Sequence, residues 1–206
     1  MDEEVDGRAT KGRHTGVADF VPASHRRLPL LRLYLPFYDP KLAAGSDTVR
    51  WSRYVDVEQD SASLSWFEVA DRVAEHDPAV RDLVPCRGEL DDDTAAALRD
   101  AVGDRAMRCL RWIGYGESPH PASPRRVFGD DFSEAPLRPE DLRAGRRIPE
   151  FAWDAEGRLA WGAQLYPDSL IVAAEVPLFR QLRNDPRLDT DSARIDRDVL
   201  PISAGE

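Results

Sequence analysis

The sequence IPEFAWDAEGRLAWGAQLYPDSLIVAA, from Ile148 to Ala174, contains three apolar segments separated by short turns. Residues 148–153 and 158–166 flank Asp154-Ala-Glu-Gly157, a short connection whose final glycine suits a β-hairpin. The continuous apolar run Ser169–Ala174 is typical of a central strand. Strands that follow one another through short turns predict antiparallel pairing in this half of the chain.

Helices are predicted mainly in the first half of the chain. Residues 65–76 carry a capping box from Ser65 to Glu68, followed by apolar residues at helical spacing. A second helix is predicted over 91–102, which opens on three aspartates, and a third begins at Leu178. Further strands are predicted over three ranges: 30–35, 48–57 and 106–115. We expect the first two of these strands to form a hairpin.

This order of elements predicts an α+β fold, mainly an antiparallel sheet with helices packed on one face. The chain has 206 residues, a length that suits one substantial core. Residues 1–27 are polar and lack periodicity, so we expect them to form a disordered tail. Residues 28–206 are expected to form a single globular α+β domain.

The composition excludes several classes of partner. The net charge is −10, which disfavours binding to nucleic acids because phosphates would be repelled. An acidic surface is instead compatible with a basic protein partner. No segment approaches the roughly 20 apolar residues that span a bilayer, and the acidic start is unlike a secretory signal. A cytoplasmic location without membrane contact is therefore expected, whereas the sequence does not indicate an oligomeric state.

Catalytic and metal-binding motifs are missing from the pattern of reactive residues. The two cysteines, Cys86 and Cys109, are not in a C-x-x-C pair, and we expect both to be unpaired, structural thiols. The four histidines do not show the paired spacing of a metal site, and no serine lies in a known nucleophile motif. No cofactor is expected, and an enzymatic function is disfavoured.

The long connection over residues 117–147 supplies the first candidate site. It contains five prolines and the sequence Phe128-Gly-Asp-Asp-Phe132. Long ordered loops are often functional, and Asp130 and Asp131 between two aromatic residues would suit contact with a basic partner. The alternative, which the sequence favours, is that Phe128 and Phe132 anchor the loop to the core. An alternative site consists of scattered polar residues beside the sheet, namely Arg111, Tyr166 and Asp168.

Part of the sequence resembles a known group of proteins. The segments Arg111–Gly116, Trp161–Leu170, Leu178–Leu182 and Asp185–Leu188 together resemble an uncharacterised group of small acidic actinobacterial proteins. The resemblance covers the C-terminal half of the chain. It implies no activity and transfers no functional residue, since no established activity is known for that group.

Two functional hypotheses follow from these observations. The first is a noncatalytic binding protein, immunity-like or regulatory, that holds a basic protein partner through an acidic surface. The analogy with bacterial immunity proteins rests on size, acidity and fold class. The second is an enzyme or small-ligand-binding protein whose site is assembled from scattered polar residues beside the sheet.

Overall fold

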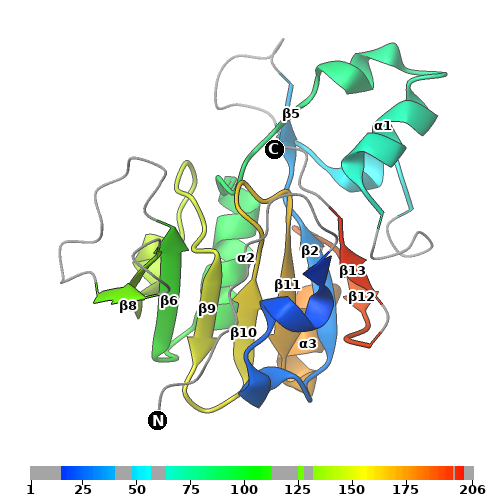
Figure 1. The fold of residues 1–206 in the computed structure, drawn as a ribbon. Helices are drawn as coiled ribbons and strands as arrows, with labels where there is room; N and C mark the ends of the chain where they lie inside the picture. Colours follow the sequence, from blue (N-terminus) through cyan, green and yellow to red (C-terminus); the bar gives the residue numbers. More distant parts are fainter. Residues whose placement is uncertain are drawn as a thin grey trace.

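An eight-stranded antiparallel sheet is the centre of the computed structural model (Figure 1). The model describes residues 15–39, 48–56, 64–112, 125–127, 132–196 and 198–201. The strands are β2 (Leu30–Tyr34), β6 (Met107–Trp112), β7 (Arg125–Val127), β8 (Phe132–Leu137), β9 (Phe151–Asp154), β10 (Leu159–Gly162), β11 (Ser169–Ala174) and β12 (Asp189–Ala193). Their order across the sheet is β12-β2-β11-β10-β9-β6-β8-β7.

The hairpin and the central strand predicted from the sequence are confirmed. Strands β9 and β10 pair with Ala160 opposite Trp153, so Asp154–Gly157 lies within the turn region. Strand β11 lies between β10 and β2, and all six of its residues are buried. Both faces of this strand must therefore be covered, as expected for a continuous apolar run.

Two helices cover one face of the sheet, which confirms the predicted fold class (Figure 1). Helix α2 (Asp92–Val102) begins where the side chain of Asp91 accepts a hydrogen bond from the amide of Thr94 at 3.0 Å. Helix α3 (Val176–Arg183) buries Leu178 and Leu182. Both helices contribute to one apolar core with strands β2, β6, β10 and β11. The helices thereby bury the apolar face that an exposed sheet would leave in water.

The opposite face of the sheet is covered by the N-terminal segment, which corrects the predicted tail. Strand β1 (Thr15–Gly16) pairs with β13 (Val199–Leu200), and two 3₁₀ turns follow, η1 (Val17–Phe20) and η2 (Ala23–His25). Val17 and Phe20 are buried and pack against residues of the sheet. Residues 15–27 are therefore folded. Their few apolar residues lie in short turns, which have no helical or strand periodicity to detect.

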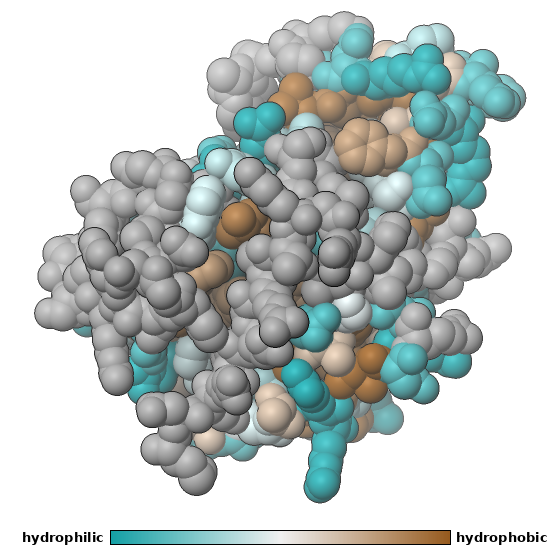
Figure 2. All heavy atoms as spheres, in the orientation of Figure 1, coloured by the Kyte–Doolittle hydropathy of each residue, from teal (hydrophilic) through white to brown (hydrophobic). Residues whose placement is uncertain are grey.

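A small lobe lies beyond one end of the large sheet. It consists of the three-stranded sheet β4-β3-β5, formed by β3 (Phe37–Tyr38), β4 (Thr48–Val49) and β5 (Val84–Pro85), with helix α1 (Trp66–Val73) and two 3₁₀ turns, η3 (Trp51–Arg53) and η4 (Pro78–Asp82). Its core contains several aromatic residues, and the stacked rings of Phe37 and Trp66 have their centres 3.9 Å apart. In Figure 2, hydrophilic side chains cover most of the outside of this lobe, and hydrophobic atoms show toward its inner side.

The lobe also corrects the predicted hairpin between residues 30–35 and 48–57. Strand β4 ends at Val49 and pairs with β3, whereas β2 pairs with β11 and β12. Trp51 does not continue the strand, because it lies in η3 and donates from Nε1 to the carbonyl of Leu35 at 2.9 Å. The alternating pattern over 48–57 is thus produced by a strand followed by a tight turn that buries Trp51 completely.

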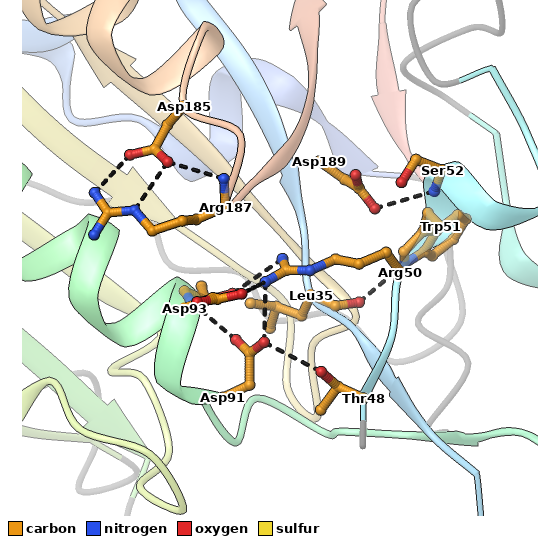
Figure 3. A network of polar contacts seen from close by, with 11 residues as sticks. Leu35, Thr48, Arg50, Trp51, Ser52, Asp91, Asp93, Asp185, Arg187 and Asp189 are labelled. Carbon is orange, nitrogen blue, oxygen red and sulfur yellow. Dashed lines mark hydrogen bonds and ion pairs between the residues drawn. The ribbon is translucent and has the colours of Figure 1, made fainter. Parts of the chain in front are cut away.

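Charged residues fasten this lobe to the main sheet and to helix α2 (Figure 3). Arg50 Nη2 lies 3.0 Å from Asp91 and 3.5 Å from Asp93 at the start of α2. The amide of Ser52 donates to Asp189, at the start of β12, over 3.1 Å. Because Asp91 also caps α2, one carboxylate both starts the helix and holds Arg50 of the lobe.

Three strands of the large sheet were not predicted, namely β7, β8 and β12, and each has a polar or proline-containing sequence. Strand β8 lies within the predicted long loop over 117–147. It contains Pro136, which lies opposite Arg108 of β6 and beyond the residues paired with β7. Strand β12 reads Asp-Thr-Asp-Ser-Ala, yet Asp189 and Asp191 are buried, with partners that include the Ser52 and Ser192 amides. These strands were missed because their sequences lack the apolar alternation from which strands are predicted.

Both cysteines are free and buried, as predicted. Burial raises the pKa of Cys86 to about 12 and that of Cys109 to about 11, so neither thiol forms the reactive thiolate at neutral pH. We expect a disulfide-exchange reagent such as DTNB to react with less than about a tenth of a thiol per native chain within minutes at pH 8. In urea it should titrate both thiols. Rapid reaction of the native protein, or no reaction in urea, would contradict this expectation.

Candidate functional site

Two residues with unusual backbone conformations lie together at one end of the large sheet. Arg87 and Tyr166 both have a φ of 51°, and no other non-glycine residue in the described ranges has a positive φ. Each such residue costs of the order of 1–3 kcal/mol unless its surroundings hold it in place. The two turns are in contact, because a Cβ on Gly88 would lie 3.0 Å from the ring of Pro167. The strain is therefore concentrated at one place.

The first turn is a tight reversal at Arg87-Gly88. The amide of Glu89 donates to the carbonyl of Cys86 at 3.0 Å, and both central residues have positive φ values, 51° and 85°. This is the pattern of a type I′ turn, which usually has asparagine, aspartate or glycine at its first central position. Here that position holds Arg87, whose side chain is exposed.

Arg147 connects the two turns. Its Nη1 donates to the carbonyl of Arg87, and its Nη2 lies 3.6 Å from Glu89 Oε1. The guanidinium carbon is 5.8 Å from the centre of the Tyr166 ring, within the range of a cation–π contact. Arg147 thus contacts both strained turns and holds the aromatic ring of the second turn in place.

Arg111 joins the same group from the end of strand β6. Its Nη1 donates to the carbonyl of Arg147 at 2.7 Å, and the neighbouring ring of Trp112 is 5.9 Å from that of Tyr166. The amide of Trp112 donates to the buried carboxylate of Glu150 at 2.8 Å. Residues of β6, of the segment before β9 and of the β10–β11 connection therefore meet at the upper end of the sheet in Figure 1.

A fourth arginine is placed here by the backbone. Residues 145–148 run beside residues 88–90, with hydrogen bonds from the Leu90 amide to the Arg146 carbonyl and from the Ile148 amide to the Gly88 carbonyl. Arg146 is exposed. We call this group the arginine rim and define it by five residues: Arg87, Arg111, Arg146, Arg147 and Tyr166.

The arginine rim differs in charge from the rest of the protein. The whole chain has a net charge of −10. Within the described part of the chain, no carboxylate is paired with the guanidinium group of Arg87, Arg111 or Arg146, whereas Arg147 is paired with Glu89. Guanidinium groups recognise phosphate and carboxylate groups through paired hydrogen bonds. The rim can therefore bind an anion beside the aromatic rings of Tyr166 and Trp112.

The structure brings together two of the three residues of the alternative site. Arg111 and Tyr166 both contact Arg147, which was not predicted to belong to the site. Asp168 instead lies in the interior, 2.9 Å from Ser169 Oγ and 3.6 Å from Nη2 of the fully buried Arg32. Arg87 and Arg147 are 60 residues apart in sequence. An arginine before a glycine in a tight turn was the only signal that could have identified Arg87.

The first candidate site falls mostly outside the described residues, which do not include Phe128, Asp130 and Asp131. Phe132 is described and is buried, with its ring 6.2 Å from that of Phe151. Its assignment to a binding surface is therefore corrected. Phe132 packs into the sheet face that the N-terminal segment covers, as expected for an anchoring residue.

Comparison with family models, curated proteins and solved structures found no match to this chain. In the described residues, no group of three or more histidine, cysteine, aspartate or glutamate side chains is arranged to hold a metal ion. Within the same residues, no helix has the length and apolar composition that crossing a membrane requires.

Proposed function

We propose that this chain is a binding protein that holds a small anionic ligand at the arginine rim. The observation that carries the proposal is that Arg87, Arg111 and Arg146, which have no carboxylate partner among the described residues, lie at or beside two strained turns in an acidic protein. Strained non-glycine residues tend to persist where function requires a fixed geometry. The proposal corresponds to the small-ligand hypothesis drawn from the sequence.

The ligand class follows from the groups that surround the rim. Arg111 and Arg87 offer guanidinium donors for a phosphate or carboxylate group. The half-buried rings of Tyr166 and Trp112, which lie edge to face, each offer an aromatic contact surface near these donors. A small molecule with an anionic group attached to a planar ring would use both features. Arg147 is paired with Glu89 and contacts the ring of Tyr166, so we assign it the structural role of positioning the other rim residues.

The overall negative charge affects the strength of binding but does not exclude it. At about 0.1 M salt, charges farther apart than about 10 Å are largely screened from one another. The nearby arginines should therefore determine the local potential, while the distant carboxylates contribute little. Affinity should fall as salt is added, because charge-assisted contacts at an exposed site are screened too.

A three-probe binding experiment tests this proposal. AMP carries a phosphate and a planar ring, inorganic phosphate carries only the anion, and adenosine carries only the ring and its sugar. We expect titration calorimetry at low salt to rank AMP above the other two. Replacing Arg111 with alanine should weaken AMP binding by about 10-fold to 100-fold, since hydrogen bonds to charged groups contribute about 1.5–3 kcal/mol.

The matched control is Arg180→Ala. Arg180 is exposed on helix α3, outside the arginine rim. This variant loses the same charge and should bind AMP as the wild type does. Equal weakening in both variants would reduce the effect to net charge and contradict a specific site. The proposal would also fail if none of the three probes bound at millimolar concentration.

The hypothesis of a basic protein partner stays a prediction. It rests on the net charge of −10 and on Asp130 and Asp131, which the structure does not describe. An immunity-like or regulatory role belongs to the same prediction, as does the resemblance to small acidic actinobacterial proteins.

A further inference from the structure

A chain of three hydrogen-bonded side chains lies at the other end of strand β9 from the arginine rim. Ser24 Oγ is 2.8 Å from His25 Nδ1, and His25 Nε2 is 3.1 Å from Asp154 Oδ1. The histidine is 1% exposed and the side chain of Asp154 is fully buried, whereas Ser24 is exposed to solvent. One hydroxyl at the surface is thus connected through an imidazole to a carboxylate in the interior.

The surroundings of Asp154 determine which way these hydrogen bonds run. Its Oδ1 also accepts from the amides of Arg158, at 2.8 Å, and Leu159, at 3.3 Å, and the guanidinium of Arg158 lies 3.8 Å from Oδ2. Oδ1 of Asp154 is therefore an acceptor, as in an ionised carboxylate, whereas the buried Oδ2 has no hydrogen-bond partner among the described residues. The neutral imidazole of His25 must then carry its proton on Nε2 and present a lone pair at Nδ1. The hydroxyl of Ser24 donates to that lone pair.

We propose that Ser24 is an activated nucleophile, with His25 as its general base and Asp154 as the residue that positions the imidazole. These are the three roles of a serine hydrolase site, which is recognised by geometry and not by position in the sequence. The substrate class is a carboxylic ester whose carbonyl approaches Ser24 from solvent. The site is separate from the arginine rim and does not depend on the function proposed there.

The reaction is an acyl transfer to water. The Ser24 hydroxyl proton moves to His25 Nδ1 while Oγ forms a bond to the ester carbonyl carbon. The bond from that carbon to the leaving alkoxide then breaks, and Nδ1 returns the proton to the alkoxide. Water next gives a proton to Nδ1 while its oxygen forms a bond to the carbonyl carbon of the acyl-serine. The bond from that carbon to Ser24 Oγ then breaks, Nδ1 returns the proton to Oγ, and the carboxylic acid is released. No oxidant, reductant or other reactant is consumed.

The competing explanation is purely structural. His25 ties the N-terminal segment to the β9–β10 hairpin, and a buried, hydrogen-bonded histidine stabilises a fold without any chemistry. The two explanations differ in one respect. A structural role requires His25 and Asp154, but it does not require the exposed hydroxyl of Ser24 to be unusually reactive.

Labelling by a fluorophosphonate probe separates the two explanations. The probe forms an oxygen–phosphorus bond with an activated serine and releases fluoride, while His25 takes the proton, so no natural substrate is required. We expect one label per full-length chain, placed on Ser24 by peptide mass spectrometry. Ser24→Ala should abolish the label. The control is Ser192→Ala, at another exposed serine that accepts from Arg183 at 3.0 Å, and it should label as the wild type does.

Asp154→Asn tests the positioning role with little change in shape. The asparagine oxygen can replace Oδ1, which contacts His25 Nε2 and accepts from the Arg158 and Leu159 amides, but the negative charge that stabilises the protonated imidazole during the reaction is lost. We expect labelling to slow by at least about 100-fold in a variant that still melts cooperatively, since an aspartate-to-asparagine change in such a site can cost about 10⁴-fold. Equal labelling of the wild type and Ser24→Ala would overturn the proposal. A folded Asp154→Asn protein that labels at the wild-type rate would likewise leave only the structural role.

Discussion

Replacing Gly162 with alanine is expected to lower the free energy of unfolding by about 3 kcal/mol or more, the upper range for overpacked cores. A Cβ at this position in strand β10 would lie 2.1 Å from the carbonyl oxygen of Phe20 and 2.8 Å from its carbonyl carbon. These are backbone atoms of the N-terminal segment, so no side-chain rotation relieves the overlap. The segment must move away from the sheet, and Val17 and Phe20 would lose part of their burial.

Thermal unfolding followed by circular dichroism measures this effect. For a chain of this size, about 3 kcal/mol corresponds to a decrease of about 6–12 °C in Tm. Hydrogen exchange should show the cause, because peptides from residues 15–27 should exchange faster while those from α2 keep their protection. Gly16→Ala is the matched control: a Cβ there would lie 3.7 Å from Asp19, an ordinary contact. An unchanged Tm for Gly162→Ala would show that the segment does not pack on β10.

Replacing Arg32 with alanine is expected to cost about 3–5 kcal/mol, the usual effect of removing one member of a buried ion pair. Arg32 is fully buried in strand β2. Its guanidinium donates to Ser169 Oγ at 2.9 Å and to the carbonyl of Leu64 at 2.6 Å, and lies 3.6 Å from Asp168. It also lies 4.6 Å from the ring centre of Tyr34. The truncated variant would leave a cavity, a buried carboxylate and a carbonyl that loses its Arg32 donor.

Two further variants separate the effect of the lost charge from that of the lost volume. Arg32→Met restores most of the volume but leaves Asp168 without this cation, whereas Arg32→Met with Asp168→Asn removes the charge as well. We expect the double variant to be at least about 1 kcal/mol more stable than Arg32→Met alone in urea unfolding, because a buried uncompensated charge is costly. Arg81→Ala is the control: its ion pair with Asp71 is exposed and should contribute less than about 1 kcal/mol. Equal effects at Arg32 and Arg81 would contradict the assignment.

The elements that sequence patterns predicted correctly are those whose stability comes from local signals. The capping box from Ser65 to Glu68 is present at the start of α1, and Gly103 follows the end of α2. Strand β11 was identifiable because both of its faces are buried and its sequence is continuously apolar. In each case the residues that determine the element lie within the element or directly beside it.

The incorrectly predicted elements depend on contacts between distant parts of the chain. Strand β12 is polar, yet Asp189 and Asp191 are buried, and Asp189 accepts from the amide of Ser52 more than a hundred residues earlier. The N-terminal segment is folded because the sheet presents Gly162 to Phe20, a match that neither sequence segment reveals alone. Tertiary contacts of this kind override local propensity.

The candidate sites, too, depend on contacts between distant parts of the chain, so only some of their residues could be predicted from the sequence. Arg111 and Tyr166 were named only as scattered polar residues beside the predicted sheet. Arg147 and Arg87 were missed because only a specific pair of turns brings them beside Tyr166. His25 was assigned to the tail, so its hydrogen bond to Asp154 had no counterpart in the sequence pattern.

The position of strand β2 has a consequence for protein synthesis. Its two neighbours in the sheet are β11 and β12, so Leu30–Tyr34 gains no sheet partner until residues 169–193 have left the ribosome. At about 5–20 residues per second, this leucine-rich segment waits on the order of ten seconds as a nascent chain. During that time its apolar side chains and unpaired amides are open to other chains. Slow translation or crowded polysomes should therefore favour aggregation, and a chaperone that binds short apolar segments should suppress it.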